Sequence, residues 1–362
     1  MPGCGLSAAS PTPRPSAPEA ARAALAAWAR RHADLDHGPA PLLVAFSGGA
    51  DSTALLLAAS ERWGARLRAV HVHHGLQPAA EAFAAHAQRV CGGWGVPLQV
   101  RRVRVELRPR RSPEEAARQA RYAALAEAAR EWQAAAVLLA HHALDQIETV
   151  LLALTRGAGL PGLAAMPERF ERGDVTFARP LLQADGRLLR AQLAAAGVPW
   201  VDDPSNVDPR RTRNRLRLQV LPALLEAFPQ APQTFARSAR HAATAQALLE
   251  ALAAQDLAGL GEPPHLSALR ALPAERRLNA LRLWLRRRHG AQASEAQWQA
   301  LAAQIEAART CGQRIELRLG CGRIRRVGDT LLWTPDASAA TTTAAASAAP
   351  TPASSCRAES KS

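Results

Sequence analysis

A six-residue string between a strand-like run and a helix-like run constrains this chain more than any other feature. Pro41–Phe46 predicts a short buried strand, Ser47-Gly-Gly-Ala-Asp-Ser52 follows it directly, and Thr53–Trp63 predicts a helix. Gly48 and Gly49 permit backbone angles that other residues avoid, and they let an anion approach the main chain. The following helix directs its unpaired N–H groups and the positive end of its dipole toward the same point. These features predict a phosphate-binding loop.

The side chains of the string have separate roles in this prediction. Ser47 and Ser52 offer hydroxyl donors, whereas Asp51 suits a Mg²⁺ ion that would bridge it to the phosphates. The alternative is a plain glycine-rich turn in which a serine or aspartate caps the helix. The complete string after a buried strand favours the phosphate loop. A Walker-type loop is excluded, because the only lysine, Lys361, is not part of a Gly-Lys-Ser/Thr triplet.

The string resembles the SGGxDS loop of the PP-loop ATP pyrophosphatase superfamily. The resemblance implies that the chain splits ATP between its α and β phosphates, adenylates a carbonyl-type oxygen and releases pyrophosphate. It also implies that ATP is bound by the loop residues Ser47, Gly48, Gly49, Ala50, Asp51 and Ser52.

Strand-like and helix-like runs alternate through the first part of the chain. We expect further strands at 66–73, 98–106 and 136–140, and helices at 19–31, 79–94, 113–132 and 144–155. This alternation predicts an α/β fold with a parallel sheet covered on both faces. From Asp202 helical patterns dominate to about Ala308, and Arg314–Trp333 predicts a pair of strands around Gly320-Cys-Gly322.

Three more stretches carry chemistry. Val70–Leu76 ends the second predicted strand, and ligands of open parallel sheets bind at the carboxyl ends of strands. We therefore expect this stretch, including His74 and Gly75, to hold the adenosine. Asp145 and Glu148 share a helix face just after His141, and such a group could receive an ammonium and remove its proton. The alternative for this group is a polar surface face with a capping role.

The third stretch, from Asp203 to Arg217, combines turn-forming Asp-Pro pairs with alternating arginines. Dense positive charge of this kind suits phosphate contacts. The alternative is a solvated basic segment in an arginine-rich protein. The formal charge of +14 also points to a polyanionic partner, most simply nucleic acid.

The remaining composition excludes several classes of site. None of the five cysteines forms a Cys-x-x-Cys pair, which argues against zinc-ribbon, thioredoxin-like and cysteine-based iron–sulfur sites: Cys4, Cys91, Cys311, Cys321 and Cys356. The N-terminus lacks the apolar stretch of a signal peptide, and no run of about 18 apolar residues occurs. We therefore expect a cytoplasmic protein that does not cross a membrane.

Together the motifs resemble bacterial tRNA(Ile)-lysidine synthetase. The matching segments are the phosphate loop, His74-Gly75-Leu76, Glu115–Tyr122, Ala140–Thr149, Arg156-Gly-Ala-Gly159, Asp203–Asn206 and Arg213-Asn-Arg215. The resemblance is strong over residues 40–222 and weak from there to about 335. The chain departs from the family pattern at Leu144, where many members have aspartate, and at Arg211, where an aromatic residue often stands. From the length of the chain we also expect a full-length second C-terminal domain to be missing.

The Pro-, Ser- and Ala-rich composition predicts a disordered arm (1–17) and a disordered tail (336–362). Between them the resemblance implies a PP-loop (adenine nucleotide alpha hydrolase-like) catalytic domain (18–222) and a helical tRNA-binding region with a short β pair (223–335). It also implies a two-step reaction. The cytidine carbonyl oxygen attacks ATP, and the side-chain amine of L-lysine then displaces AMP. The partners are ATP, Mg²⁺, L-lysine and a tRNA(Ile) with a CAU anticodon, and no protein partner is required.

The implied residue roles follow the same matches. Asp145 is the candidate base, with His141 and Glu148 orienting the ammonium, and Asp51 is the catalytic residue that holds the metal. The candidates for ATP or tRNA phosphate contacts are Arg118, Arg121, Arg156, Arg213 and Arg215. Rival hypotheses are a tRNA thiolase, a small-molecule synthetase of the amidotransferase type and a non-catalytic RNA-binding protein.

Overall fold

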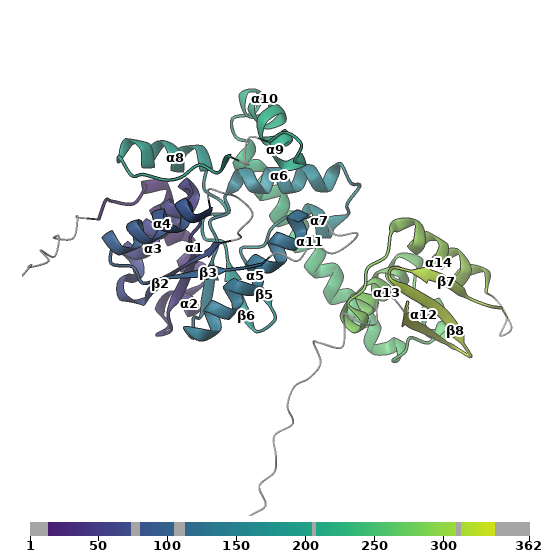
Figure 1. Cartoon of the computed structure of the whole chain (residues 1–362). Helices are drawn as coiled ribbons and strands as arrows, with labels where there is room; N and C mark the ends of the chain where they lie inside the picture. Colours follow the sequence, from purple (N-terminus) through teal and green to yellow (C-terminus); the bar gives the residue numbers. More distant parts are fainter. Residues whose placement is uncertain (1–13, 74–79, 105–112, 205–207, 309–312, 337–362) are drawn as a thin grey trace, which may run out of the picture. The chain divides into compact units, whose positions relative to one another are not determined.

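The computed structural model describes residues 14–73, 80–104, 113–204, 208–308 and 313–336 (Figure 1). The chain divides into two units, residues 1–243 and 244–362, with the boundary inside the long helix α11 (Ala231–Leu260). His74, Gly75 and Asn206 lie outside the described residues. So do most of the segments predicted as a disordered arm and tail.

A six-stranded sheet forms the centre of the first unit. Its strand order is β3-β2-β1-β4-β6-β5, and every neighbouring pair is parallel except the edge pair of β5 and β6. The strands are β1 (Leu42–Ala45), β2 (Leu67–His73), β3 (Leu98–Arg102), β4 (Ala136–Leu138), β5 (Arg169–Arg172) and β6 (Val175–Ala178). The predicted α/β fold with a parallel sheet is confirmed.

The residues of β1 show why the sheet is covered on both faces. Successive side chains of a strand point to opposite faces. Leu42 and Val44 pack in a core with helices α1, α3, α4 and α8, whereas Leu43 packs in a second core with helix α5. A strand buried on both sides needs a continuous apolar run, as the sequence provides.

The helices of the first unit follow the expected ranges closely where the pattern is strong. Helix α1 covers the predicted residues, and the helices at 79–94, 113–132 and 144–155 each begin and end within one residue of expectation. The bounds are α1 (Glu19–Arg31), α2 (Ala33–His37), α3 (Ala50–Trp63), α4 (Ala80–Gly93), α5 (Pro113–Glu131), α6 (Ala143–Leu154), α7 (Leu160–Leu163) and α8 (Gly186–Ala195). The hairpin of β5 and β6 was not predicted.

A short helical segment completes the first unit above the carboxyl ends of the strands. It contains α9 (Thr212–Arg215), a π-helical turn (Leu216–Val220) and α10 (Leu221–Ala227). Leu221 packs against Ile147 of α6 and Ala231 of α11. This packing brings the arginine-rich stretch beside α6, which carries two of the predicted catalytic residues.

The second unit is helical with one small sheet. Trp284, Leu301 and Ile324 belong to its apolar core. Its remaining elements are α12 (Leu266–Ala271), α13 (Ala274–His289), α14 (Glu295–Ala307), β7 (Glu316–Leu319), β8 (Gly322–Val327) and β9 (Thr330–Pro335). The strand pair expected around Gly320–Gly322 is a three-stranded antiparallel sheet, because a second tight turn after Val327 adds β9.

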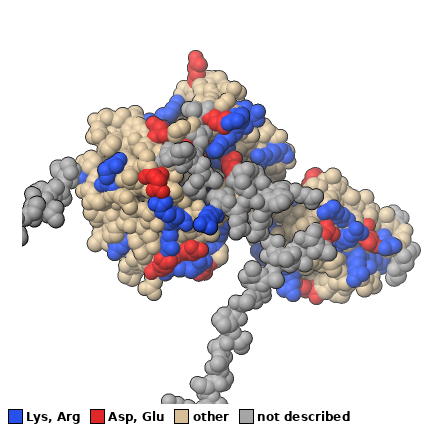
Figure 2. Space-filling view, viewed as in Figure 1, with Lys and Arg blue, Asp and Glu red and all other residues tan. Residues whose placement is uncertain are grey.

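Charged side chains are spread over both units. Figure 2 shows basic and acidic groups side by side on the visible face, so the positive charge is not gathered there in a single patch. No helix among the described residues is both long and apolar enough to span a membrane.

Candidate active site

The predicted phosphate loop connects β1 to α3 and is tied together by its own hydroxyl groups. Ser47 Oγ lies 3.0 Å from Ser52 Oγ, and the Ser52 hydroxyl donates to the Gly49 carbonyl at 2.9 Å. The Gly49 N–H donates to Ser47 Oγ at 3.3 Å. Helix α3 begins at Ala50, so its first N–H groups have no acceptor within the helix and are available to an anion.

Gly48 is the position in this loop that requires glycine. Its φ of +88° lies in a region that other residues rarely adopt. An added Cβ would lie 3.1 Å from Val201 Cγ2 and 3.2 Å from His86 Cδ2. The Gly48 carbonyl also accepts a hydrogen bond from the Val201 N–H at 3.0 Å. The loop is thus held by chain that lies about 150 residues away in sequence.

His142 joins the phosphate loop to helix α6. Its Nε2 lies 3.5 Å from Asp51 Oδ2, and its Nδ1 lies 3.6 Å from Asp145 Oδ2. The His142 N–H donates to the same Asp145 oxygen at 3.0 Å, so this carboxylate also caps the helix. One buried imidazole therefore lies between the loop aspartate and the predicted base.

The electrostatics of this group favour a cationic His142 ring. Burial lowers the pKa of His142, but Asp145 and Asp51 outweigh it and raise that pKa to about 9. Burial works against ionisation of Asp145 as well, yet the charged His142 ring and the His142 N–H hold the pKa of that carboxyl below its ordinary value. Asp145 is therefore ionised at neutral pH and is ready to attract a cation.

Glu148 is fully buried and is paired with Arg217. The Arg217 Nε donates to Glu148 Oε1 at 2.8 Å, and Arg217 Nη2 lies 2.7 Å from the same oxygen. Arg217 Nη2 also donates to Asp145 Oδ1 at 3.3 Å. Burial raises the pKa of Glu148, and Arg217 opposes that change. The two carboxylates predicted to receive an ammonium thus share one guanidinium.

His141 faces a different neighbourhood from His142. Burial lowers the pKa of His141 to about 3, so the ring is neutral, and the arginines around it act in the same direction: Arg179, Arg121 and Arg118. Burial together with Arg118 and Arg213 also lowers the pKa of Arg121. Of the five arginines expected to contact phosphate, Arg118 and Arg121 therefore lie near His141, and Arg213 lies near Arg121.

The other two of these arginines lie elsewhere. Arg215 is exposed on α9. Arg156 is exposed just past the end of α6, and the 12 residues of that helix separate it from His142 by about 18 Å at 1.5 Å per residue. His74 and Gly75, expected at the adenosine, lie outside the described residues.

Sequence reasoning missed several residues that build this site. Of the adjacent pair His141 and His142, it chose the one that does not touch Asp51, because nothing local tells which ring turns toward the loop. Arg217 was visible only as part of an alternating arginine run. His86 and Val201, which pack on Gly48, carried no signal that connects them to the loop.

Gly186 makes room for the His142 ring. A Cβ at position 186 would lie 2.7 Å from His142 Nε2, so Gly186→Ala is expected to push the ring away from both aspartates. A misplacement of about 1 Å in an active site can lower the rate by about 10²-fold. The ATP-dependent pyrophosphate release of the purified variant measures this. Gly92→Ala, where no atom lies within 4 Å, is the control, and full activity of Gly186→Ala would contradict the assigned role of His142.

The loop fits a nucleotide with a divalent cation. Asp51 Oδ1 is buried and has no hydrogen-bond partner among the described residues. In the same residues no cluster of three or more His, Cys, Asp or Glu side chains could hold a metal ion. A cation at Asp51 would thus take one ligand from the protein and the others from phosphate and water oxygens, as Mg²⁺ commonly does.

Two family models match the chain. A PP-loop domain matches residues 25–224, and the TilS substrate binding domain matches residues 265–332. The chain is 52% identical over 300 residues to a tRNA(Ile)-lysidine synthase of Polaromonas naphthalenivorans, covering 83% of this chain and 91% of the relative. It is 46% identical over 259 residues to the tRNA(Ile)-lysidine synthase of Pseudomonas putida, covering 68% of this chain but only 60% of that relative.

A solved structure shares the fold. The U34-tRNA thiolase NcsA from Methanococcus maripaludis, which carries a [4Fe-4S] cluster, aligns with a TM-score of 0.52 at 15% identity. The alignment covers 61% of this chain and 76% of that chain. At this identity the similarity concerns the fold alone.

Proposed function

Because this chain belongs to the tRNA(Ile)-lysidine synthase family, we propose that it joins L-lysine to the wobble cytidine of a CAU-anticodon tRNA(Ile). The reaction consumes ATP in the presence of Mg²⁺ and releases AMP and pyrophosphate. One observation carries the proposal. His142 lies between Asp51 of the phosphate loop and Asp145, so the nucleotide site and the carboxylates that suit an amine adjoin each other.

In the first step the ring carbonyl oxygen of the cytidine attacks the α-phosphate of ATP. Ser47, Ser52 and the first N–H groups of α3 hold the phosphates, and His142 keeps Asp51 oriented. Mg²⁺ at Asp51 would offset the charge of the departing pyrophosphate. The product of this step is an adenylated cytidine, in which AMP has become a good leaving group.

In the second step the side-chain amine of lysine attacks the activated ring carbon, and AMP leaves. The amine arrives as an ammonium and must lose a proton before it can attack. Asp145 attracts the ammonium and accepts that proton, while the fully buried Glu148 offers a second carboxyl group to it. The neutral His141 ring lies at the same end of α6 and contributes to orienting the amine.

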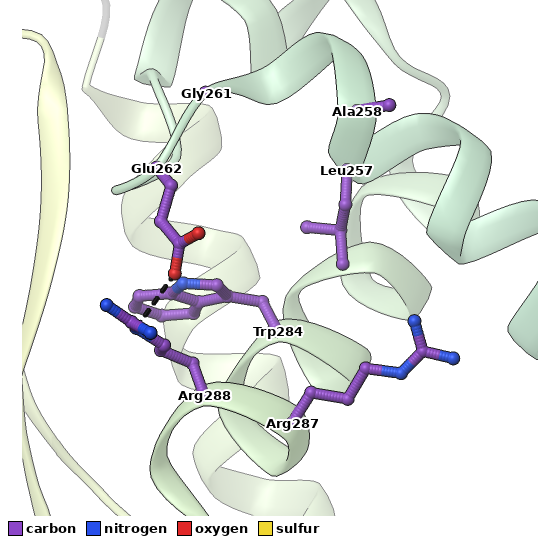
Figure 3. A pocket seen from close by; sticks show the side chains of 7 residues that line it. All are labelled: Leu257, Ala258, Gly261, Glu262, Trp284, Arg287 and Arg288. Atoms are coloured by element: carbon purple, nitrogen blue, oxygen red, sulfur yellow. Dashed lines mark ion pairs between the residues drawn. The ribbon is translucent and has the colours of Figure 1, made fainter. Parts of the chain in front are cut away.

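A pocket of about 470 Å³ in the second unit supports the proposal that this unit contacts tRNA. In Figure 3, Arg287 and Arg288 extend along opposite sides of the pocket with Trp284 between them, and Arg288 pairs with Glu262 at 2.9 Å. Trp284 is buried in the core of this unit, so the exposed guanidinium groups are the part of the pocket suited to contact RNA phosphates.

Arg287→Ala is therefore expected to weaken tRNA binding. A lost phosphate contact should reduce the slope of log affinity against log salt by about one, without changing kcat at saturating tRNA. Filter binding at several salt concentrations measures the slope. Arg22→Ala removes an exposed arginine from α1 as the matched control, and equal slopes for the two variants would contradict a role of this pocket in RNA binding.

The rival functions have less support. A cluster-dependent thiolase requires paired cysteines, and the two described cysteines, Cys91 and Cys321, lie in different units. Burial raises the pKa of the Cys91 thiol to about 12, which makes it unreactive at neutral pH. A non-catalytic RNA-binding protein would not need Asp51 and Asp145 on either side of one buried imidazole.

Lysine incorporation into tRNA tests the proposed function. Purified protein, ATP, Mg²⁺ and labelled lysine are mixed with CAU-anticodon tRNA(Ile), and a methionine tRNA with the same anticodon is the control. We expect label in the isoleucine tRNA only. Label in both tRNAs would support the ligation of lysine but refute selectivity for the isoleucine tRNA. Pyrophosphate release without label would refute lysine as the amine substrate. The absence of both would favour the RNA-binding alternative.

A further inference from the structure

Arg217 occupies the two carboxylates that the proposed reaction needs for its amine. It contacts Glu148 Oε1 through two nitrogens, at 2.8 and 2.7 Å, and it reaches Asp145 Oδ1 at 3.3 Å. Both carboxylates belong to α6, whereas Arg217 belongs to the π-helical turn that follows α9. The guanidinium therefore lies where the ammonium of the substrate would have to make its contacts.

The carboxylate of Glu148 is covered by Arg217, but one of its two oxygens has no hydrogen-bond partner among the described residues. Its exposed fraction is 0%, and its second oxygen, Oε2, is buried with no hydrogen-bond partner among the described residues. A buried carboxylate without a positive partner is costly, so Glu148 depends on Arg217 when no amine is bound. The unused Oε2 is a further acceptor that a small cation could reach only if the guanidinium moves.

The side chain of Arg217 is placed to move. It is 40% exposed, in contrast to the buried carboxylate that it covers. It projects from a single π-helical turn, a rare local geometry that often occurs at functional sites. Because solvent borders one side of the guanidinium, the Arg217 side chain can change its rotamer without repacking the core around Glu148.

We propose that Arg217 is a displaceable counter-ion that closes the amine subsite until the substrate ammonium replaces it at Glu148 and Asp145. The inference rests on the proposed function, because it takes a primary amine as the second substrate. The exchange replaces one cation by another, so Glu148 stays paired throughout and no buried charge is left alone. Arg217 thereby acts as a positioning residue and does not take part in bond making.

Arg217→Met tests the proposal through the sign of its effect on lysine binding. Without the competing guanidinium, we expect the KM for lysine to fall by about tenfold, the factor that corresponds to roughly 1.4 kcal/mol. Arg217→Lys keeps a cation at the site, so we expect its lysine KM to stay near that of the unchanged protein. Pyrophosphate release in the absence of lysine is measured for all three proteins, so that any effect on the first step is separated from the effect on the lysine KM.

The opposite sign would overturn the proposal. If Arg217 only shapes the site, Arg217→Met should raise the lysine KM and lower kcat, with Arg217→Lys in between. Arg237→Met, a change of an exposed arginine on α11, controls for the loss of one charge, and Arg217→Gln replaces Arg217→Met if that variant does not fold. Lysine transfer by the unchanged protein is measured first. If the unchanged protein transfers no lysine, the proposed function is refuted, and the inference about Arg217 falls with it.

Discussion

Asp51→Ala is expected to abolish tRNA-dependent pyrophosphate release, with a loss of at least about 10³-fold. Asp51 is the acidic residue of the first turn of α3, and its Oδ1 is buried without a partner among the described residues. In the proposed mechanism, its removal takes away the protein's ligand for the cation that would neutralise the departing pyrophosphate. It also leaves His142 with one carboxylate in place of two. Release of labelled pyrophosphate from ATP, with tRNA present, measures the loss.

The control for this variant is Glu61→Ala, which removes an acidic side chain from the other end of the same helix. Glu61 pairs with Arg22 at 3.8 Å, far along α3 from the loop. Both variants should keep the circular dichroism of the unchanged protein. Pyrophosphate release by Asp51→Ala within about tenfold of the unchanged rate would exclude Asp51 as the metal ligand.

Asp145→Asn is expected to separate the two steps of the reaction. Adenylation of the cytidine should continue, since the phosphate loop is untouched, whereas lysine transfer should fall by about 10²–10⁴-fold through loss of the base. The amide oxygen can still accept the His142 N–H, so the cap of α6 is retained. Quench-flow assays that follow pyrophosphate and labelled lysine in the same reaction show whether the adenylated tRNA accumulates.

Asp145→Ala provides a harsher version of the same experiment. It also removes the helix cap, which costs about 1 kcal/mol in the free energy of unfolding. Ser294→Ala, which removes the N-cap of α14 in the second unit, controls for that structural loss. Normal lysine transfer by a folded Asp145→Asn protein would show that another group accepts the proton.

The fold was predictable wherever a local pattern is strong. The apolar run of β1 predicts a strand because that strand is buried on both faces, and the apolar positions of α1 predict a helix because they recur at helical spacing. The β5–β6 hairpin was missed for the opposite reason. Its strands are four residues each, and β5 begins and ends with arginine, so its pattern is that of a polar loop. The pairing of β6 with β4 adds the hairpin to the sheet, and β5 in turn pairs with β6.

The candidate site was predictable in part. The loop residues from Ser47 to Ser52 lie together because they are consecutive, and Asp145 and Glu148 share a face because a helix repeats every 3.6 residues. Their assignment to ATP and to the amine remains a proposal. Neither rule could show that Glu148 is fully buried, since burial depends on what packs over the helix.

The sequence by itself determined the phosphate loop, the parallel sheet and the family, because each is written in residues that lie next to one another. Only the tertiary structure decided that His142, and not His141, touches Asp51 and Asp145. Neighbouring side chains at a helix start point in different directions, and Gly186 leaves room for the His142 ring. It also decided that Arg217 meets Glu148, 69 residues away in sequence, because such a contact arises from packing between elements and leaves no local pattern.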